Sequence, residues 1–508
     1  MDAMAAPLRP WSRAVLAGLL GCALFFAVGW VTAELFAPRS APHLVLGAAV
    51  VDAAPPLLVD TAIDLFGAAD KVVLAVVLAV VSAGVAVLIA RVATGHPFLG
   101  ELLVAGLGVL CLLLALTRPE GAPVWVLPSV LATVAAVFGL HRITRAPAPG
   151  AQPSRRVFVR SLAGMGIATV LATAGGIAVA GVRRSSQSLR AHVHLPAPAR
   201  PAPPIPAGAQ VDLPQMPPLT TPNQDFYRVD TALIPPRVDP EQWRLRIHGL
   251  TEQDMELTYA DLLAEDLVQV HLTLTCVSNP VGGDLAGNAT WLGVPLRRLL
   301  QRAGPQQEAD MVLSRSVDGF TAGTPLPALT DDRGALLAVG MNGQVLPVDH
   351  GFPVRMVVPG LYGYVSATKW VTDLEVTRFD RATAYWTERG WAPRAPIKTA
   401  ARIDVPRSGD TFDGGTVMVG GTAWAQHRGV RRVQVRVDDG PWREATLATE
   451  VNIDTWRQWF IQLEGLTPGE HRITCRAWDP SGPQTATVAP PVPNGSSGYH
   501  SVTVTARE

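Results

Sequence analysis

The second half of this chain is organised around one stretch, VQVHLTLTC at residues 268–276. Its apolar and polar residues alternate, and a period of two is typical of a β-strand with one buried face. Cys276 falls on the apolar positions and ends the strand, and the loop that follows contains Gly282 and Gly283, which let the backbone approach a ligand. The pattern predicts a half-buried strand that presents one thiol to a glycine-containing loop.

A thiol in this place has two interpretations, a metal ligand or a small buried core residue. Spacing alone favours the core residue, because most free cysteines behave as buried hydrophobic groups. No second Cys or His stands at the spacing of an ordinary zinc site. The chain has four cysteines in 508 residues, which excludes the disulfide framework of a small secreted domain.

Composition divides the chain into two parts. Its 508 residues have room for about three domains. A hydrophobic content of 48% and a mean hydropathy of +0.23 are too high for a purely soluble protein. Residues 1–190 carry 14 Lys or Arg and 8 Asp or Glu, and the rest carries 28 and 34, so the net charge of zero conceals +6 and −6. The overall balance offers no basic excess of the kind that suggests a nucleic-acid binder.

Five apolar runs in the first part approach the length of about 20 residues that a helix needs to span a membrane. They cover residues 11–31, 72–90, 102–116, 124–140 and 162–182. Residues 44–65 contain three aspartates and two prolines, so we expect an exposed loop or a re-entrant piece there, not a span. Residues 1–185 are therefore predicted to form an α-helical transmembrane bundle of about five helices.

Loop charges predict the orientation of this bundle. The basic loops would be cytoplasmic, and they carry Arg9, Arg13, Arg91 and five arginines between residues 142 and 160. The acidic loop would lie outside, and it carries Asp52, Asp60, Asp64 and Asp70. Five spans that begin inside put residue 191 onward outside, so we expect a multi-pass protein of the cell membrane with its later domains on the extracytoplasmic side.

One segment of the basic loop, SRRVFVR at residues 154–160, resembles a twin-arginine export signal. In such a signal, paired arginines and a following Phe precede a moderately apolar helix. An ordinary positive-inside cluster is the alternative, because paired arginines are common in an arginine-rich chain. A genuine signal would imply export of a folded domain, which a cofactor inserted in the cytoplasm requires. The segment is internal, so it would remain as an uncleaved anchor.

The rest of the chain divides where its composition changes. Residues 191–223 contain ten prolines, which is typical of a semi-rigid, extended linker, and we place this linker at 186–222. Residues 399–508 have the length of an immunoglobulin-like sandwich and alternating strands, with Asp439-Gly440 as a hairpin turn. The candidate catalytic domain lies between them, at residues 223–398.

Over residues 215–508, several motifs in a fixed order resemble the sulfite oxidase family of molybdopterin-dependent oxidoreductases. They are TPN at 221–223, FYR at 226–228, LTCVSN at 274–279, DGF at 318–320, MNGQVLP at 341–347, DHGFPVR at 349–355 and TKW at 368–370. The resemblance implies a central α+β molybdopterin domain followed by an all-β, Ig-like dimerisation domain. Together with the transmembrane bundle, it predicts a multi-domain, membrane-anchored bacterial form of this family.

The resemblance also implies roles for single residues. Cys276 matches the thiolate that binds molybdenum, and a soft anionic sulfur suits such a metal. Arg228 would line the pocket beside the cofactor and bind an oxygen of an anionic substrate. Asp318 matches an acceptor for the pterin ring. The other positions that match cofactor-binding residues are Tyr227, His350, Arg355, Ala367, Thr368 and Lys369.

Two departures from the family pattern leave the substrate open. Family members follow the pocket arginine with Asn-His, whereas Val229-Asp230 follows it here. An acid near an anion site disfavours a dianion by charge repulsion, unless it pairs with Arg228. The active-site tyrosine of the family also has no certain match in the segment that begins at Tyr385.

The resulting hypothesis is a Mo-molybdopterin oxidoreductase that moves one oxygen atom and two electrons at the outer face of a membrane. Sulfite oxidation, and reduction of an S-oxide or N-oxide, are alternatives of the same chemistry. A non-enzymatic, membrane-anchored interaction protein is an alternative of a different class. A quinone or a cytochrome would exchange the electrons, the Ig-like domain would form a homodimer, and no nucleic acid is expected as a partner.

Overall fold

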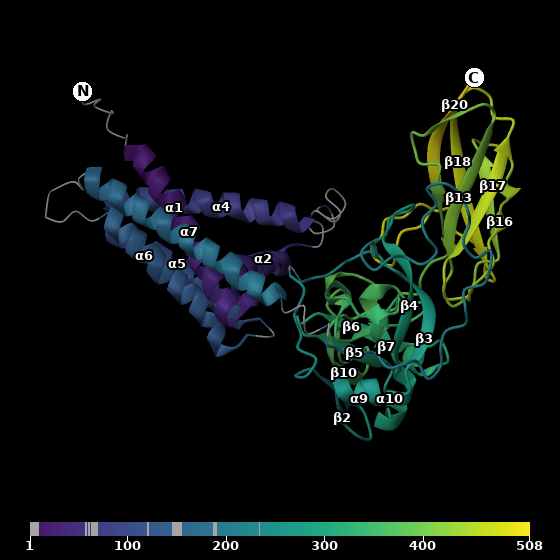
Figure 1. Ribbon diagram of the computed structural model, residues 1–508, viewed down its shortest axis with the longest axis horizontal. Coiled ribbons are helices and arrows are strands. Elements are labelled where there is room, and N and C mark those ends of the chain that lie inside the picture. The colour runs from purple at the N-terminus through teal and green to yellow at the C-terminus, as the bar shows by residue number, and fades with distance from the viewer. Residues whose placement is uncertain are drawn as a thin grey trace. The chain divides into compact units, whose positions relative to one another are not determined.

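The computed structural model describes residues 10–55, 58, 61, 70–118, 121–144, 155–185, 190, 192–232 and 234–508 (Figure 1). The chain forms two compact units. The helical unit comprises Met1–Leu189 and Thr231–Ile234, and the β-rich unit comprises Arg190–Asp230 and Pro235–Glu508.

Within the described residues, the helical unit has five helices that are long and apolar enough to cross a membrane. This confirms the prediction of five long apolar helices. They are α1 (Pro10–Phe36), α4 (Asp70–Gly95), α5 (Pro97–Leu116), α6 (Val126–Thr144) and α7 (Arg155–Ser185). Helix α1 packs against α4, α6 and α7. Large apolar side chains of α4, such as Val72, Val80 and Leu88, stay exposed, as expected of helices that face lipid.

Helix α2 (Pro42–Ala53) lies where we expected an exposed loop or a re-entrant piece and no span. An exposed loop is wrong for this stretch, whereas the absence of a span from the described part of it is confirmed. The helix is apolar and has 12 residues, which is too short to span a membrane. Pro42 stands in its first turn, where the amide hydrogen that proline lacks is not needed. Several residues behind the predicted orientation and export signal lie outside the described residues or side chains: Arg9, Asp60, Asp64, Arg145, Ser154 and the side chains of Asp70, Arg155 and Arg156.

The first region of the β-rich unit is α+β and contains two sheets. One sheet has the order β2 (Met255–Thr258), β1 (Arg244–Gly249), β10 (Val371–Thr377), β5 (Met311–Ser316) and β6 (Thr321–Pro325). The other has the order β3 (Val268–Thr275), β4 (Ala286–Pro295), β7 (Leu336–Met341) and β8 (Gln344–Val345), and β9 (Arg355–Val357) pairs with β7. The short helices are α9 (Tyr259–Ala264), α10 (Leu296–Ala303) and α11 (Leu326–Thr330).

The C-terminal region is an all-β sandwich, as predicted. One sheet has the order β11 (Ala400–Val405), β13 (Thr416–Trp424), β17 (Arg457–Glu464) and β16 (Thr446–Leu447). The other has the order β12 (Thr411–Asp413), β20 (His500–Arg507), β18 (Gly469–Asp479), β14 (Arg432–Val437) and β15 (Arg443–Glu444), with β19 (Gly482–Pro483) paired to β18. Cys475 and Trp459 are fully buried in its core, so Cys475 is a packing residue.

Strand β3 differs from the prediction of one buried and one open face. Thr273 and Thr275, expected on the open face, are each 1% exposed. The sandwich covers them and bonds to the strand: the Thr273 amide donates to Asp454 O (3.0 Å), and Gln426 Nε2 donates to Thr275 Oγ1 (2.9 Å). The alternating pattern shows which residues are polar, but a second domain supplies the partners that allow them to be buried.

The Pro-rich segment is extended, but it is not a free spacer. The Ala199 amide donates to Leu267 O (2.8 Å), and the Gln269 amide donates to Arg200 O (2.9 Å), so the segment lies along the start of β3. Further on, the Val211 amide donates to Gln458 Oε1 of the sandwich at 2.7 Å. An extended polyproline-type backbone leaves its amides and carbonyls without internal partners, which makes it available for such pairing.

Candidate functional site

The thiol of Cys276 lies where β3 ends, at the entrance to the loop that leads to β4. Its amide donates to Leu285 O at 2.9 Å, and the residue is 8% exposed. Burial raises the pKa of the Cys276 thiol, while hydrogen bonds at Ser278 and the positive charge of Lys369 act in the opposite direction. The thiolate is the form that binds a metal, and a cation at this position would supply the missing stabilisation.

A cluster of positive side chains faces this region from residues 350–369. Gly351 makes the cluster possible, because its φ of +110° is favourable only for glycine. A Cβ at this position would lie 3.0 Å from Cβ of Arg355 and 3.1 Å from Cα of Lys369. The turn at Gly351 therefore brings Arg355, on β9, close to the segment that carries Lys369.

Arg355 is a buried cation whose hydrogen bonds within the described part of the chain all go to carbonyl groups. It is 4% exposed and donates to His350 O (3.2 Å), Ala367 O (3.4 Å) and Met356 O (3.4 Å). Its guanidinium also lies 5.1 Å from the centre of the Trp291 ring. No carboxylate pairs with it among the described residues, and burial lowers its pKa to about 10. The charge of Asp230 acts on Arg355 without forming an ion pair with it. A buried guanidinium without an ion pair is a strong site for an anion such as a phosphate.

His350 contributes a hydrogen-bond acceptor, Nδ1, that lacks a donor among the described residues. Its Nε2–H donates to Asn223 O at 2.8 Å, whereas Nδ1 is buried and has no partner among the described residues. Burial, together with the charges of Arg355 and Lys369, lowers the pKa of His350 to about 4, so the ring is neutral at pH 7. A ligand that presents an N–H or O–H to Nδ1 would satisfy this atom.

Asp230 joins the two remaining cations. One carboxylate oxygen lies 2.5 Å from Lys369 Nζ, and the other lies 2.7 Å from Arg228 Nε. Arg228 also reaches Asp349, at 3.6 Å. Burial lowers the pKa of Lys369 to about 8, and the charge of Asp230 acts against this shift. The acid noticed at position 230 thus pairs with Arg228, and it pairs with Lys369 as well.

Tyr227, Ala367 and Thr368 also belong to this neighbourhood. Burial raises the pKa of Tyr227, and both Cys276 and Arg355 are close enough to influence it. Thr368 Oγ1 is 2.7 Å from Ser314 Oγ, and Ala367 contributes the carbonyl that Arg355 contacts. The structure brings all the predicted site residues together except the side chain of Asp318, which accepts from the Phe320 amide (3.2 Å) within its own turn.

The expected segment for the active-site tyrosine of the family begins at Tyr385, but a different tyrosine, Tyr362, lies close to the thiol. Tyr385 stacks under the guanidinium of Arg389, 3.6 Å from the ring centre, and packs against Phe320. Tyr362, which was not singled out, is 5% exposed, and the charge of Cys276 contributes to a pKa raised to about 12, mainly by burial. The sequence offers no pattern that marks Tyr362, because its proximity to the thiol comes from the packing of two separate loops.

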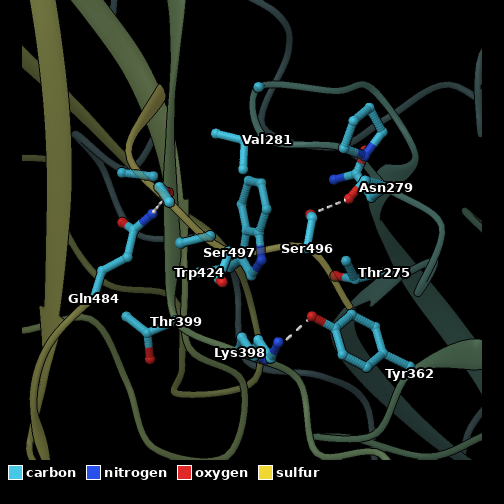
Figure 2. A pocket seen from close by; sticks show the side chains of 15 residues that line it. Thr275, Asn279, Val281, Tyr362, Lys398, Thr399, Trp424, Gln484, Ser496 and Ser497 are labelled. Atoms are coloured by element: carbon cyan, nitrogen blue, oxygen red, sulfur yellow. Dashed lines mark hydrogen bonds between the residues drawn. The ribbon is translucent and has the colours of Figure 1, made fainter. Parts of the chain in front are cut away.

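The C-terminal sandwich holds the thiol loop from the other side, around a small cavity (Figure 2). Ser496 Oγ donates to Asn279 O (2.5 Å), and Arg402 donates to Gly283 O (2.7 Å). The ring of His500 packs so closely on Gly282 that a Cβ there would overlap it. Lys398 lies beside Tyr362 in Figure 2, and its Nζ donates to Asn494 Oδ1 (2.9 Å). We therefore assign Lys398 a structural role.

These groups fit a molybdopterin cofactor. Its phosphate requires buried cations, its pterin ring offers hydrogen-bond donors, and its metal accepts a soft thiolate. Arg355 is a buried cation without a carboxylate partner, Nδ1 of His350 is an acceptor without a donor, and Cys276 is a buried thiol at a strand end. Each of the three gains a partner from such a cofactor.

Comparison with known proteins identifies a molybdopterin-binding domain in the same part of the chain. The family described as "Oxidoreductase molybdopterin binding domain" matches residues 232–386. Mitochondrial sulfite oxidase of Macaca fascicularis is 32% identical over 323 residues, covering 53% of this chain and 58% of that protein. Sulfite oxidase of Gallus gallus is 31% identical over 311 residues, covering 51% and 67%.

The chain therefore spans less than two thirds of the mammalian relative. Among solved structures, the sulfane dehydrogenase SoxCD from Paracoccus pantotrophus superposes with a TM-score of 0.48 and 22% identity, over 56% of this chain and 80% of that one. With the family match and the relative from Gallus gallus, the chain belongs to the sulfite oxidase family of molybdopterin-binding oxidoreductases.

Proposed function

We propose that this protein is a membrane-anchored oxidoreductase that uses Mo-molybdopterin to transfer an oxygen atom to or from a small substrate. One observation carries the proposal: the buried thiol of Cys276 shares a site with a buried guanidinium, Arg355, that has no carboxylate partner among the described residues. A purely structural domain gains nothing from burying such a charge without an ion pair, because its desolvation costs several kcal/mol unless an anion binds.

The side chains divide the work of holding the cofactor. Cys276 would bind the metal, Arg355 and Lys369 would bind the phosphate, and Nδ1 of His350 would accept a hydrogen bond from the pterin. Backbone groups of Ala367 and Thr368, with Tyr227, would close the pocket, and Asp318 would turn from its own loop toward the ring. When bound, the cofactor supplies the metal through which an oxygen atom and two electrons are exchanged.

Arg228 is the group that would position the substrate. Its side chain is 36% exposed, whereas the side chains of Lys369 and Asp230 are 11% and 2% exposed, so it lies at the entrance of the cluster. Sulfite oxidation would convert sulfite and water into sulfate, two protons and two electrons. Reduction of an S-oxide or N-oxide would consume two protons and two electrons and release water. In either direction, a quinone or a cytochrome would exchange the electrons.

The helical unit and the sandwich complete the proposal. Five apolar helices would anchor the protein in the cell membrane, with the β-rich unit on the extracytoplasmic side as the loop charges predict. The arginine pair at 155–156 would direct export of the folded, cofactor-loaded unit. The sandwich, residues 399–508, would form a homodimer.

Metal analysis of the purified full chain tests the central claim. After expression in a host that makes the cofactor, we expect one molybdenum per chain and pterin fluorescence after oxidation. Cys276→Ala should lose most of the molybdenum, while Cys22→Ala, which removes a thiol in α1, should keep it. Absence of molybdenum from the parent, or equal content in Cys276→Ala and the parent, would contradict the proposal.

Two further measurements address substrate and export. Stopped-flow mixing of the loaded protein with sulfite and with S-oxides shows which compound changes the molybdenum spectrum, and hence the direction of the reaction. Replacing Arg155 and Arg156 by Lys should stop export of the loaded β-rich unit. If this unit still appears outside the cell with its cofactor, the arginine pair acts only as a positive-inside cluster.

A further inference from the structure

Asp230 occupies an unusual position for a carboxylate in an anion-binding site. Its side chain is 2% exposed, and its two oxygens contact two different cations, Lys369 (2.5 Å) and Arg228 (2.7 Å). The neighbouring Val229 is 46% exposed, so burial differs sharply between adjacent positions. Burying a carboxylate costs several kcal/mol unless it is paired, and here both oxygens are paired.

The charges around the site can be assigned one by one. The cations are Arg228, Arg355 and Lys369, and the acids in contact with them are Asp230 and Asp349. Arg355 is the cation of this set without a carboxylate partner among the described residues. The two carboxylates form their ion pairs with Arg228 and Lys369, and Asp230 acts on Arg355 only from a longer distance. The least compensated charge therefore lies deep in the site, where the phosphate of the cofactor would bind.

This distribution leaves little positive charge at the entrance. Arg228 retains N–H groups that can donate to an oxygen atom, but its charge is already balanced by Asp230 and Asp349. A neutral S–O or N–O group requires only such donors. Because Asp230 is paired with Arg228 and Lys369, it acts on a dianion mainly by neutralising the positive charge that a dianion requires. A dianion would have to displace the carboxylate from two ion pairs, which costs energy.

We propose that Asp230 determines substrate charge: it selects neutral, oxygen-bearing substrates such as S-oxides or N-oxides and disfavours dianions such as sulfite. The inference rests on the proposed function, because it concerns the same site. It assigns to Asp230 a role in specificity, exerted through Arg228 and Lys369, and no direct part in the chemistry.

Sulfate, an unreactive tetrahedral dianion, is a suitable probe. The full chain in detergent is titrated with sulfate at constant ionic strength maintained with chloride, and binding is followed by the thermal unfolding midpoint. We expect Asp230→Asn to bind sulfate at least about 10-fold more tightly than the parent, because one buried negative charge is removed. The parent should show no stabilisation by sulfate beyond that by chloride, a result that depends on no variant.

Two variants separate the charge from other effects of the substitution. Asp349→Asn removes a carboxylate that is 57% exposed and 3.6 Å from Arg228, so it should change sulfate affinity less than about 3-fold. Asp230→Glu keeps the charge and should remain close to the parent. The inference is wrong if the parent binds sulfate tightly, if Asp230→Asn matches the parent, or if Asp230→Glu gains affinity as Asp230→Asn does.

Molybdenum content, measured on the same preparations, distinguishes this inference from the proposed function. A loaded parent whose Asp230→Asn variant shows no gain in sulfate affinity overturns the role of Asp230 and leaves the oxidoreductase intact. A gain of about 10-fold in preparations that never contain molybdenum supports the charge balance at Asp230 and overturns the proposed function.

Discussion

The two sides of the candidate site are held in place by different parts of the chain. On the cation side, Gly351, Arg355 and Lys369 lie within 20 residues of one another, and one turn brings them together. On the thiol side, the loop after Cys276 is held by the sandwich, through bonds that span 217 residues to Ser496 and 119 residues to Arg402. The cation side therefore depends on local geometry, and the thiol side depends on the docking of a second domain.

This difference changes the role of the sandwich. A module that served only for dimerisation would not need to reach the strand that carries the thiol. Here the Trp456 amide donates to Thr273 Oγ1 (2.8 Å) and Gln426 Nε2 donates to Thr275 Oγ1 (2.9 Å), both buried contacts on β3. Substitutions on the two sides should accordingly produce different defects.

Gly351→Ala should have the largest effect, because it adds a Cβ against Arg355 and Lys369 in a left-handed conformation. We expect a loss of about 3 kcal/mol in the free energy of unfolding, measured by denaturant titration of tryptophan fluorescence. Gly334→Ala is the matched control, since Gly334 has a similar φ of +81° with no atom within 4 Å. Strain alone predicts a loss of about 1 kcal/mol there, and equal losses would show that the contact at Gly351 is unimportant.

Arg355→Met should come next, and it should affect the cofactor more than the fold. Removing one partner of a buried charged contact typically costs 2–5 kcal/mol, so we expect cofactor affinity to fall about 100-fold. The measurement is molybdenum per chain after gel filtration. Arg378→Met removes an arginine that pairs with Asp380 at the surface, and it should leave the molybdenum content unchanged. Full retention in Arg355→Met would remove Arg355 from the cofactor site.

Thr273→Val tests the thiol side. The substitution preserves shape but leaves the Trp456 amide and Asn288 Oδ1 without their bonds to Thr273 Oγ1 (2.8 and 3.0 Å). Two buried groups without partners should lower the free energy of unfolding by about 2 kcal/mol. Thr446→Val, at an exposed position of β16, should change it by less than about 0.5 kcal/mol. An unchanged stability in Thr273→Val would mean that the sandwich docks without these bonds.

The smallest expected effect is on the pH dependence of stability. It arises from one buried histidine on the cation side, His350, and one on the thiol side, His500. Burial lowers the pKa of both His350 and His500 to about 4, so the unfolded state binds more protons than the folded state between about 6.5 and 4. Stability should therefore fall as pH decreases through this window. Replacing either histidine by Gln should reduce the loss between pH 7 and pH 5.5 by about 1 kcal/mol. A pH profile identical to that of the parent would contradict the assignment of neutral, buried rings.

Much of this architecture could be predicted from local patterns. The five apolar runs predicted the five long helices, since a membrane-spanning helix is recognisable from length and composition alone. The motifs DHGFPVR and TKW marked His350, Arg355 and Lys369 as cofactor-binding residues through the resemblance to the sulfite oxidase family. The alternation at 268–275 predicted β3 and the position of Cys276 at its end.

Most of the errors share one cause, which is contact with a distant part of the chain. Thr273 and Thr275 were expected on an open face, and the Pro-rich segment was expected to be a spacer, but both bond to other elements of the β-rich unit. Tyr362 was missed because no pattern marks a residue brought near Cys276 by packing. Helix α2 was missed because aspartates and prolines later in 44–65 were taken to describe the whole segment.

The sequence by itself determined the division of the chain into a part with five long apolar helices and a β-rich part, the strand that carries the thiol and the motifs that supply the cations. These features depend on periodicity, composition and neighbouring residues. Only the tertiary structure decided that Asp230 joins Arg228 to Lys369, that Arg355 has no carboxylate partner among the described residues, and that the sandwich holds the thiol loop. Such facts depend on distances between residues far apart in the chain, which packing alone determines.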